Sequence, residues 1–207
     1  MSENDLSADV ENRSPRHDDW ITFRHFADVD RGRARSQGEA WSNASNTPFR
    51  LHKRWVHEGG IATPLIAHWP AKIQATGALS HQPGHVVDIM ATCLDVADAH
   101  YPEVHNGNPI KPAPGISLLP WLTDPDQNLD RTLYWEHEKH AAIRQGDWKL
   151  VSLNGRNKTA WELYDMSNDR TETKNVAQEH PDRVARLKTL WTEWARDVNV
   201  LPWPQDR

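Results

Sequence analysis

The stretch TLYWEHEKHAAIRQGDWKLVSL, residues 132–153, carries the strongest signal for the fold. Residues 132–137 alternate apolar and polar side chains, and residues 141–153 hold two short apolar runs on either side of Gln145-Gly146. Alternation with a period of two is typical of a strand with one buried face, and a glycine between two such runs is typical of a hairpin turn. Together with WELYDM at residues 161–166, the stretch predicts a small antiparallel sheet.

The segment that follows this sheet, HPDRVARLKTLWTEWARDV at residues 180–198, has the pattern of an amphipathic helix. Pro181 suits the first helical turn, and the carboxylate of Asp182 favours the positive end of the helix dipole. One helical face collects the apolar side chains Val184, Leu187, Leu190, Trp191 and Trp194. We therefore expect this helix to lie across the sheet and cover one of its faces.

Upstream, IATPLIAHW at residues 61–69 forms an apolar run between Gly59-Gly60 and Pro70. A run that is apolar on both faces predicts a buried strand in a sheet that helices cover on both sides. The rest of the sequence offers too few further strands to surround it. We therefore expect exposed apolar surface here, and a tendency to aggregate or to need a partner.

Residues 86–98, VVDIMATCLDVAD, place apolar side chains three and four positions apart and predict a second amphipathic helix. Cys93 falls on its apolar stripe, which favours a packing role over a nucleophilic one. Residues 101–130 are dense in Pro, Gly and Asn and predict an irregular connection, as do residues 71–85. Residues 1–45 are rich in charged and small polar side chains, so we expect them to be mostly disordered or peripheral.

Composition limits the possible classes of protein. A net charge of −5 gives no general electrostatic case for nucleic-acid binding, and the single cysteine rules out an internal disulfide. No window is apolar for long enough to span a bilayer, and residues 1–19 hold no apolar core of a signal peptide. As written, the sequence shows no leader and predicts a cytoplasmic chain that contacts neither nucleic acid nor membrane, but it does not fix the compartment.

Two groups of side chains are candidates for chemistry. WEHEKH at residues 135–140 gathers His and Glu, but its two histidines are three apart in a strand, whereas a zincin motif needs them four apart on a helix. Alternation then sends Glu136 and His137 to opposite faces, so this segment alone predicts no metal site.

The second group comprises Arg50, Lys53, Arg54 and His57, which precede Gly59-Gly60. Cations held just outside a strand end can bind a tetrahedral oxyanion at short range. Spacing alone favours the other interpretation, a solvated basic face. The sequence contains neither a phosphate-binding glycine loop nor the Gly-x-Ser-x-Gly motif of a hydrolase nucleophile, so those two classes are disfavoured.

The order of these motifs resembles the C-terminal part of the type I sulfatases, in particular the bacterial arylsulfatases. The resemblance rests on SNTPFRLHKRWVHEGGIATPLIAHWP, GHVVDIMATCLDVA, LYWEHEKHAAIRQGDWKLV, WELYDMSNDRTETKNVA and WARDVNVLPWP. It implies an α/β fold, a partial alkaline-phosphatase-like sulfatase fold with its late strand and helix, followed by a small antiparallel α+β subdomain. It divides the chain into three segments. Residues 1–40 have no family match, residues 41–125 form the end of the catalytic domain, and residues 126–207 form the C-terminal subdomain.

The resemblance also implies an activity, the hydrolysis of sulfate esters with a formylglycine nucleophile and a divalent cation, usually calcium. By this resemblance Lys53 corresponds to a late active-site lysine that contacts a sulfate oxygen, while Arg50 and Arg54 remain structural or solvated charges. His57 and His137 are weaker candidates for the substrate pocket, with packing or solvent exposure as the alternative for either.

The sequence also departs from the family pattern. The nucleophile motif, a Cys or Ser followed by x-Pro-x-Arg, is absent because Leu-Asp-Val-Ala follows Cys93, and the family's metal ligands have no counterpart. We therefore expect the chain to bind no calcium, to form no formylglycine and to be inactive alone, with a complementary N-terminal sulfatase part as its possible partner. Two alternatives stay open: a non-catalytic module that binds protein or sulfated glycans, and a phosphoesterase of the same superfamily.

Overall fold

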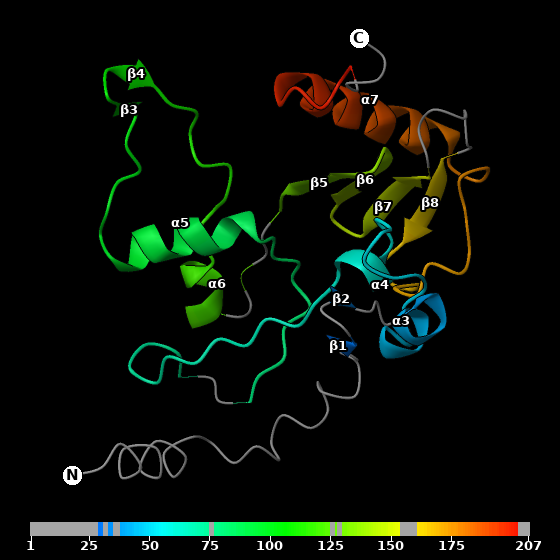
Figure 1. Ribbon diagram of the computed structural model, residues 1–207, viewed down its shortest axis with the longest axis horizontal. Coiled ribbons are helices and arrows are strands. Elements are labelled where there is room, and N and C mark those ends of the chain that lie inside the picture. The colour runs from blue at the N-terminus through cyan, green and yellow to red at the C-terminus, as the bar shows by residue number, and fades with distance from the viewer. Residues whose placement is uncertain are drawn as a thin grey trace.

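A computed structural model describes residues 38–74, 77–124, 127, 130–153 and 161–202, together with the backbone of two short strands (Figure 1). These strands, β1 (Val29–Asp30) and β2 (Arg33–Ala34), pair antiparallel. Most of residues 1–40, which we expected to be disordered, therefore lies outside the described residues. The end of residues 1–45, which we expected to be mostly disordered or peripheral, forms the helix α3 (Glu39–Ser45), and none of its residues is buried.

The predicted antiparallel sheet is present and has four strands in the order β5-β6-β7-β8. The strands are β5 (Thr132–His137), β6 (His140–Gln145), β7 (Trp148–Ser152) and β8 (Glu162–Asp165). The turn between β6 and β7 is Gly146-Asp147, one residue later than predicted. Gly146 has a φ of +57°, which a glycine at the first position of a two-residue hairpin turn adopts without steric cost.

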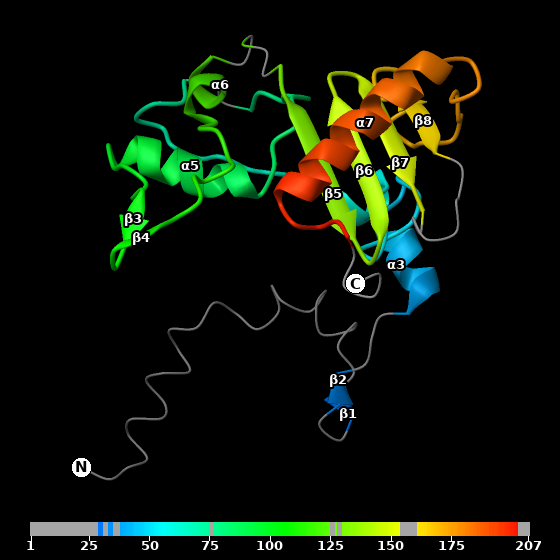
Figure 2. The ribbon, with the colours of Figure 1, turned by 90° about the horizontal axis from the view of Figure 1, so that it is seen from above.

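The C-terminal helix α7 (Pro181–Asp197) lies across one face of this sheet, as predicted (Figure 2). Its predicted apolar face packs on the sheet, where Leu187 is fully buried and Trp191 nearly so. Trp191 Nε1 donates a hydrogen bond to the backbone oxygen of Trp135 at 3.0 Å, which satisfies its polar atom inside the core. The core on this side also contains Ile143, Leu150, Leu163, Val176 and Ala195.

The opposite face of the sheet packs against a segment from far earlier in the chain. A one-turn helix, α4 (Glu58–Ile61), lies on this face, on the other side of the sheet from α7 (Figure 1). A smaller apolar cluster forms beneath it from Val56, Ala142, Val151, Tyr164 and Met166. Residues 50–60 are therefore joined to the C-terminal sheet although about a hundred residues separate the two in the sequence.

A third region lies beside the sheet and contains α5 (Val87–Val96), α6 (Leu119–Thr123) and the two-residue strands β3 (Val104–His105) and β4 (Asn108–Pro109) (Figure 1). The helix predicted over residues 86–98 is confirmed as α5, and α6 lies in a segment predicted to be irregular. In this region the carboxylate of Asp88 is fully buried. It accepts hydrogen bonds from the backbone of His85 at 2.7 Å and of Ile116 at 3.1 Å, and pairs with Arg131 at 2.8 Å.

Two predictions for this third region are wrong. Residues 62–69 belong to no strand, and Ile66 is 89% exposed. Cys93 is exposed rather than packed, and so are Val86 and Met90 of the same predicted stripe. In both places the apolar pattern of the sequence is real, but the described residues supply no surface to bury it. The exposed apolar surface that the sequence predicted is thus present.

Candidate functional site

Residues 50–60, which we call the Lys53 loop, fold back on themselves through two glycines. A Cβ atom on Gly59 would lie 2.3 Å from the backbone oxygens of Arg50 and Leu51, and one on Gly60 would lie 1.9 Å from the oxygen of Trp55. Both distances are far below van der Waals contact, so only glycine allows the loop to close this tightly. The Gly59 N–H also donates to the Arg50 oxygen at 3.2 Å.

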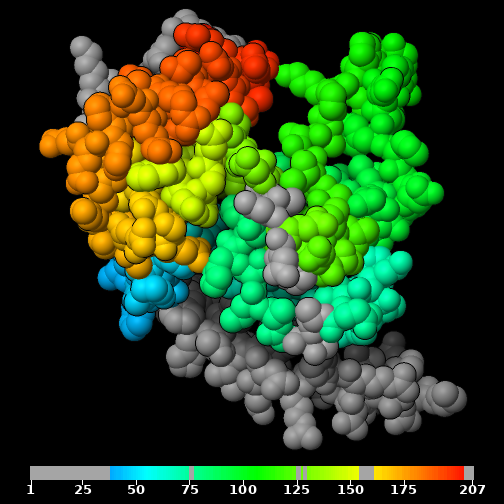
Figure 3. Space-filling model, turned by 180° about the vertical axis from the view of Figure 1, so that it is seen from behind, coloured from blue at the N-terminus to red at the C-terminus, as the bar shows by residue number. Residues whose placement is uncertain are grey.

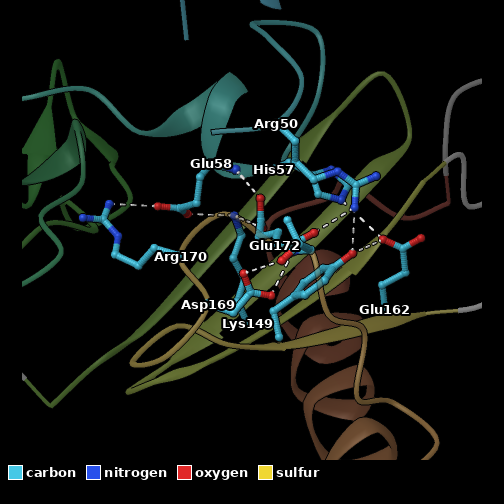
Figure 4. A network of polar contacts seen from close by, with 10 residues as sticks. Arg50, His57, Glu58, Lys149, Glu162, Asp169, Arg170 and Glu172 are labelled. Carbon is cyan, nitrogen blue, oxygen red and sulfur yellow. Dashed lines mark hydrogen bonds and ion pairs between the residues drawn. The ribbon is translucent and has the colours of Figure 1, made fainter. Parts of the chain in front are cut away.

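The Lys53 loop is fastened to the sheet by a buried ion-pair network (Figure 4). At its centre Lys149 of β7 is fully buried, and its Nζ lies 2.8 Å from an oxygen of Glu58 and 2.8 Å from an oxygen of Glu172. The Glu58 backbone N–H donates to the other Glu172 oxygen at 2.7 Å, and Arg170 reaches Glu58 at 3.2 Å. A charge buried this deeply is tolerated only when it is paired and hydrogen-bonded, and Lys149 has both kinds of partner.

A second set of bonds fastens the other end of the loop. Arg50 donates from Nη1 to the Tyr164 hydroxyl at 3.1 Å and to the backbone oxygen of Glu172 at 2.9 Å. The Tyr164 hydroxyl in turn donates to Glu162 at 2.5 Å, and the fully buried His57 places Nε2 3.4 Å from the same carboxylate oxygen. Residues at both ends of the loop are therefore bonded to the sheet, while Lys53 lies between them.

Glu172 occupies its place in the network through an unusual backbone. It is fully buried with a φ of +56°, a conformation that costs a non-glycine residue free energy. The surrounding turn is held by Asp169, whose carboxylate accepts the backbone N–H groups of Thr173 and Lys174, each at 2.8 Å. The turn thus directs one more carboxylate toward Lys149.

The network determines the ionisation of its members. Burial alone would raise the pKa of Glu58, but the nearby Lys149 and Arg170 lower it overall. A hydrogen bond from His57, with a further one from Tyr164, lowers the pKa of Glu162 despite its partial burial. Burial and the neighbouring Glu162 carboxylate raise the pKa of Tyr164. At neutral pH Glu58 and Glu162 are therefore charged and Tyr164 keeps its proton.

Beside the loop lies a cluster of aromatic rings and basic groups. The Trp55 and His140 rings lie 4.6 Å apart between centroids, and His140 is mostly buried. Burial lowers the pKa of His140, and so do Arg54, His137 and His57, while Glu138 raises it. His140 is thus held neutral at physiological pH. Both weaker sequence candidates, His57 and His137, lie close enough to influence this ring.

The three predicted site residues lie in different environments. Lys53 is exposed in a turn of its loop, His137 is exposed at the end of β5, and His57 is fully buried against Glu162. Of the remaining basic residues, Arg50 has a structural role in the network, and Arg54 forms a surface pair with Glu138 at 2.7 Å. Both fit the expectation of structural or solvated charges.

The network itself was not predicted from the sequence, although one signal for it was present. Lys149 sits between Trp148 and Leu150 in a strand whose other residues are mostly apolar. A lysine at a position that alternation places on a covered face requires a buried acidic partner. The sequence does not show that these partners are Glu58 and Glu172, because Glu58 and Glu172 are distant from Lys149 in sequence and approach it only in the folded chain.

An open cavity of about 520 Å³ lies between residues 79–83, the start of β5 and the β6–β7 turn. Its walls carry both Arg131 and Arg144 together with Asp130 and Asp147. Arg131 is already paired with Asp88. The mixed charge of this cavity selects neither an anion nor a cation.

Three rings in the Lys53 loop have a buried nitrogen with no hydrogen-bond partner in the part of the chain that the structure describes, namely those of His52, Trp55 and His57. Buried polar atoms normally have a partner. The loop therefore has hydrogen-bonding capacity that the described chain leaves unused.

The cofactors that the resemblance implies do not fit the described residues. Nowhere in the described ranges do three His, Cys, Asp or Glu side chains gather in a way that could hold a metal ion. Cys93, the one cysteine, is followed by Leu-Asp-Val-Ala and not by the sequence that precedes formylglycine formation. Within the described segments, no helix is long and apolar enough to cross a membrane.

Comparison with known proteins identifies the family. Residues 49–196 match the family of the N-sulphoglucosamine sulphohydrolase C-terminal region. The chain belongs to the sulfatases. An uncharacterised sulfatase of Schizosaccharomyces pombe is 31% identical over 82% of this chain and 31% of its own length. Mouse N-acetylgalactosamine-6-sulfatase is 31% identical over 64% of this chain and 24% of its own.

Solved structures confirm the fold of this sulfatase chain. A Bacteroides thetaiotaomicron protein from a study of glycosaminoglycan metabolism superimposes with a TM-score of 0.58 and 25% identity, covering 70% of this chain and 31% of the other. The protein Ps i-CgsB superimposes with a TM-score of 0.60 at 22% identity over 72% of this chain. The chain spans about a third of the length of these relatives, and the family match places it in their C-terminal part.

Proposed function

We propose that this chain is the C-terminal part of a sulfuric ester hydrolase and that it contributes Lys53 to binding of the sulfate group. The observation that carries the proposal is the Lys53 loop, an exposed ammonium group on a segment that a buried network fastens at both ends. A lysine offers three donors and a compact positive charge, which suits a sulfate oxygen. A rigid backbone on either side of the cation reduces the entropy lost when the anion binds.

Lys53 has aromatic and basic neighbours. Trp55 and Arg54 belong to the Lys53 loop itself, the neutral ring of His140 lies 4.6 Å from the Trp55 ring, and Arg54 is paired with Glu138. The ring nitrogens of His52, Trp55 and His57 that have no partner among the described residues are buried, so they concern the packing of the loop and not the binding of a ligand at its surface.

Sulfatases hydrolyse their esters with a formylglycine nucleophile and a divalent cation, and this chain supplies neither group from its described residues. We therefore propose that both come from the part of the fold that the chain does not span. The role of this chain is then to bind and orient the sulfate through Lys53, and it turns over no ester alone.

For the substrate class we propose sulfated sugars. The support is the printed names of the relatives, N-acetylgalactosamine-6-sulfatase for the mouse protein and N-sulphoglucosamine sulphohydrolase for the matching family. A sugar sulfate also presents hydroxyl groups, which exposed basic side chains can hydrogen-bond.

The experiment measures turnover and binding separately. The purified chain, with calcium, should release no sulfate above buffer from 4-nitrophenyl sulfate or N-acetylgalactosamine 6-sulfate. Binding of N-acetylgalactosamine 6-sulfate, followed by NMR titration, should weaken by about tenfold or more in Lys53→Ala, because a charge-assisted hydrogen bond is lost. Lys72→Ala, which removes another exposed lysine, is the matched control and should change nothing.

Three outcomes would contradict the proposal. Turnover by the chain alone would show that it contains its own catalytic groups. Binding that is the same in Lys53→Ala as in Lys72→Ala would favour a non-catalytic module that holds glycans elsewhere on its surface. Tighter binding of the corresponding phosphate ester would favour a phosphoesterase.

A further inference from the structure

The open cavity of about 520 Å³ lies where the region of α5 and α6 meets the four-stranded sheet, and these two parts stand side by side in Figure 3. One wall comes from residues 79–83, and the other comes from the start of β5 and the β6–β7 turn. The Lys53 loop reaches the opposite end of β6, where the Trp55 ring lies beside His140. Since a strand of this length spans roughly 17 Å, the cavity is a place separate from Lys53.

The walls of the cavity are held in place by hydrogen bonds within the chain. On one wall Trp121 Nε1 donates a hydrogen bond to the Ser80 hydroxyl at 2.9 Å. On the other, Arg144 Nε donates to the backbone oxygen of Gly146 at 3.0 Å, which fixes the guanidinium against the β6–β7 turn. A cavity whose walls are already ordered loses little conformational entropy when a ligand binds.

The charged groups that line the cavity do not neutralise one another by direct contact. The carboxylates of Asp130 and Asp147 form no hydrogen bond or ion pair with any residue that the structure describes, and neither do the terminal nitrogens of Arg144. Arg131 is already paired with the fully buried Asp88 at 2.8 Å. The cavity therefore offers a ligand one guanidinium and two carboxylates.

The rest of the lining is neutral. The side-chain amide of Gln82 supplies both donors and an acceptor. Leu133, which is 4% exposed, and Pro83 add apolar surface. Two carboxylates disfavour an anion, and the guanidinium disfavours a simple cation. The lining instead suits a neutral ligand with many hydroxyl groups, which both donate and accept hydrogen bonds, and with an apolar side.

We propose that this cavity binds a neutral saccharide. A sugar ring carries hydroxyl groups around its rim and C–H groups on its faces, so it matches both parts of the lining. Its hydroxyl groups donate to Asp130 and Asp147, and Arg144 donates to a hydroxyl or ring oxygen. A cavity of this volume is in the range that holds compact organic ligands, and a disaccharide is of that size.

This saccharide site is independent of the proposed function. It uses no residue of the Lys53 loop, and its ligand carries no sulfate. The two sites also have separate reporters, because Trp121 donates to the wall of the cavity, whereas Trp55 belongs to the Lys53 loop. Their ligands can therefore be followed separately on the same chain.

The test titrates the full chain with three neutral disaccharides, lactose, maltose and diacetylchitobiose, and follows binding by NMR. At least one of them should bind at millimolar concentration and shift the indole N–H signal of Trp121 and the backbone N–H signal of Gly146. Asp130→Ala should weaken this binding by roughly three- to tenfold, because a hydrogen bond to a charged group is lost. Asp197→Ala, which removes an exposed carboxylate at the end of α7, is the matched control and should change nothing.

Arg144→Gln should weaken disaccharide binding to a similar extent. Arg144 is partly buried in the sheet, so this variant is compared by circular dichroism before its binding is measured. Asp130 is exposed and lies before β5, so Asp130→Ala decides the question if Arg144→Gln does not fold.

Two signals that stay unshifted with all three disaccharides would overturn the proposal, and so would equal affinities of Asp130→Ala and Asp197→Ala. Glycine or inorganic sulfate that shifts these signals at a lower concentration than the sugars would show that the cavity selects charge, which also contradicts it. Lys53→Ala should bind the disaccharides normally. Disaccharide binding without any effect of Lys53→Ala on N-acetylgalactosamine 6-sulfate would refute the proposed function alone. Lys53-dependent binding of that sulfate ester without disaccharide binding would refute the saccharide site alone.

Discussion

The C-terminal unit, residues 130–153 and 161–202, and the helical region, residues 62–124, treat the same kind of side chain in opposite ways. Ile143, Leu150 and Leu187 in the C-terminal unit are fully buried, whereas Ile66 and Ile89 in the helical region are 89% and 51% exposed. Both regions carry apolar patterns of the correct period. A hydrophobic pattern in the sequence therefore indicates which side chains favour burial. Whether they are buried depends on the surfaces that the rest of the chain supplies.

The C-terminal unit buries its apolar side chains because its sheet is covered on both faces. Helix α7 packs on one face and the Lys53 loop packs on the other. In the helical region the buried apolar side chains are chiefly Leu118 and Trp121, with the hydrogen-bonded Asp88 between α5 and the loop before α6. We expect the C-terminal unit to hold the stability of the chain.

The largest effect is expected at the ion pair that joins the Lys53 loop to the C-terminal unit. Lys149→Met leaves two buried carboxylates, Glu58 and Glu172, without their shared cation, and should lower the free energy of unfolding by about 3–5 kcal/mol. Urea denaturation followed by tryptophan fluorescence measures this loss. Lys174→Met, which removes an exposed ammonium group, is the control and should change it by less than about 0.5 kcal/mol.

A loss below about 1 kcal/mol in Lys149→Met would mean that the ion pairs contribute little to fastening the loop. Adding Glu58→Gln and Glu172→Gln to Lys149→Met should recover part of the loss, because the uncompensated charges are then removed. A triple variant that is less stable than Lys149→Met would contradict this explanation.

The next effect compares the two regions directly. Leu187→Ala removes a fully buried side chain from the C-terminal core and should cost about 2–5 kcal/mol. Ile66→Ala truncates an exposed side chain of similar size and should change stability by about 0.5 kcal/mol or less. Both are measured by thermal and urea unfolding of the isolated chain. Equal losses would show that residues 62–69 are buried in solution by self-association.

A smaller effect is expected within the Lys53 loop. Gly60→Ala places a methyl group 1.9 Å from the Trp55 oxygen, so the loop must open, at a cost of roughly 1–3 kcal/mol. Gly84→Ala is the matched control, since its Cβ would meet Leu118 at an ordinary 3.6 Å. Hydrogen exchange over residues 50–60 should quicken in Gly60→Ala only. Unchanged exchange would contradict the tight closure of the loop.

The smallest expected effect is a dependence of stability on pH in two stages. The pKa of His140 and of His85 lies below the ordinary 6.5, mainly through burial, so on acidification the unfolded chain takes up protons before the folded one, and stability falls below about pH 6.5. The pKa values of Glu58 and Glu162 in the folded chain are lowered from 4.5. Their contribution to the free energy of unfolding is therefore present above pH 4.5 and is lost as the pH falls through their pKa values in the folded chain. Melting temperatures measured between pH 8 and 3 test both stages. A melting temperature that stays constant between pH 8 and 5 would contradict the first stage, which we assign to His140 and His85.

Much of the C-terminal unit could be predicted, because local patterns and local contacts agree there. The strand at residues 132–137 was predicted with its observed bounds, and Val184, Leu187 and Trp191 were placed on the correct face of the last helix. The strand predicted at residues 61–69 is absent, since strand pairing depends on residues far away in sequence. Helix α6 was missed because its prolines suggested an irregular segment, although Pro120 is compatible with a first helical turn.

For the site, sequence resemblance singled out Lys53, and its role remains a prediction that the binding experiment tests. The buried carboxylates that hold its loop were not recognised as partners of Lys149. His57, a weaker candidate for the substrate pocket with packing as its alternative, is fully buried. His57, Glu58, Lys149 and Glu172 come from three distant parts of the chain. Which of their charges meet depends on how the segments pack.

By itself the sequence determined the sulfatase motifs, the antiparallel sheet with its covering helix, and the apolar character of residues 61–69 and 86–98. These follow from periodicity, from turn glycines and from motif order, all of which are local properties of the chain. Only the tertiary structure decided that the Lys53 loop is fastened beneath the sheet by Lys149, and that the apolar strand and helix stay open. Those outcomes depend on which distant surfaces meet, because burial and ion pairing are properties of a contact and not of the residues taken singly.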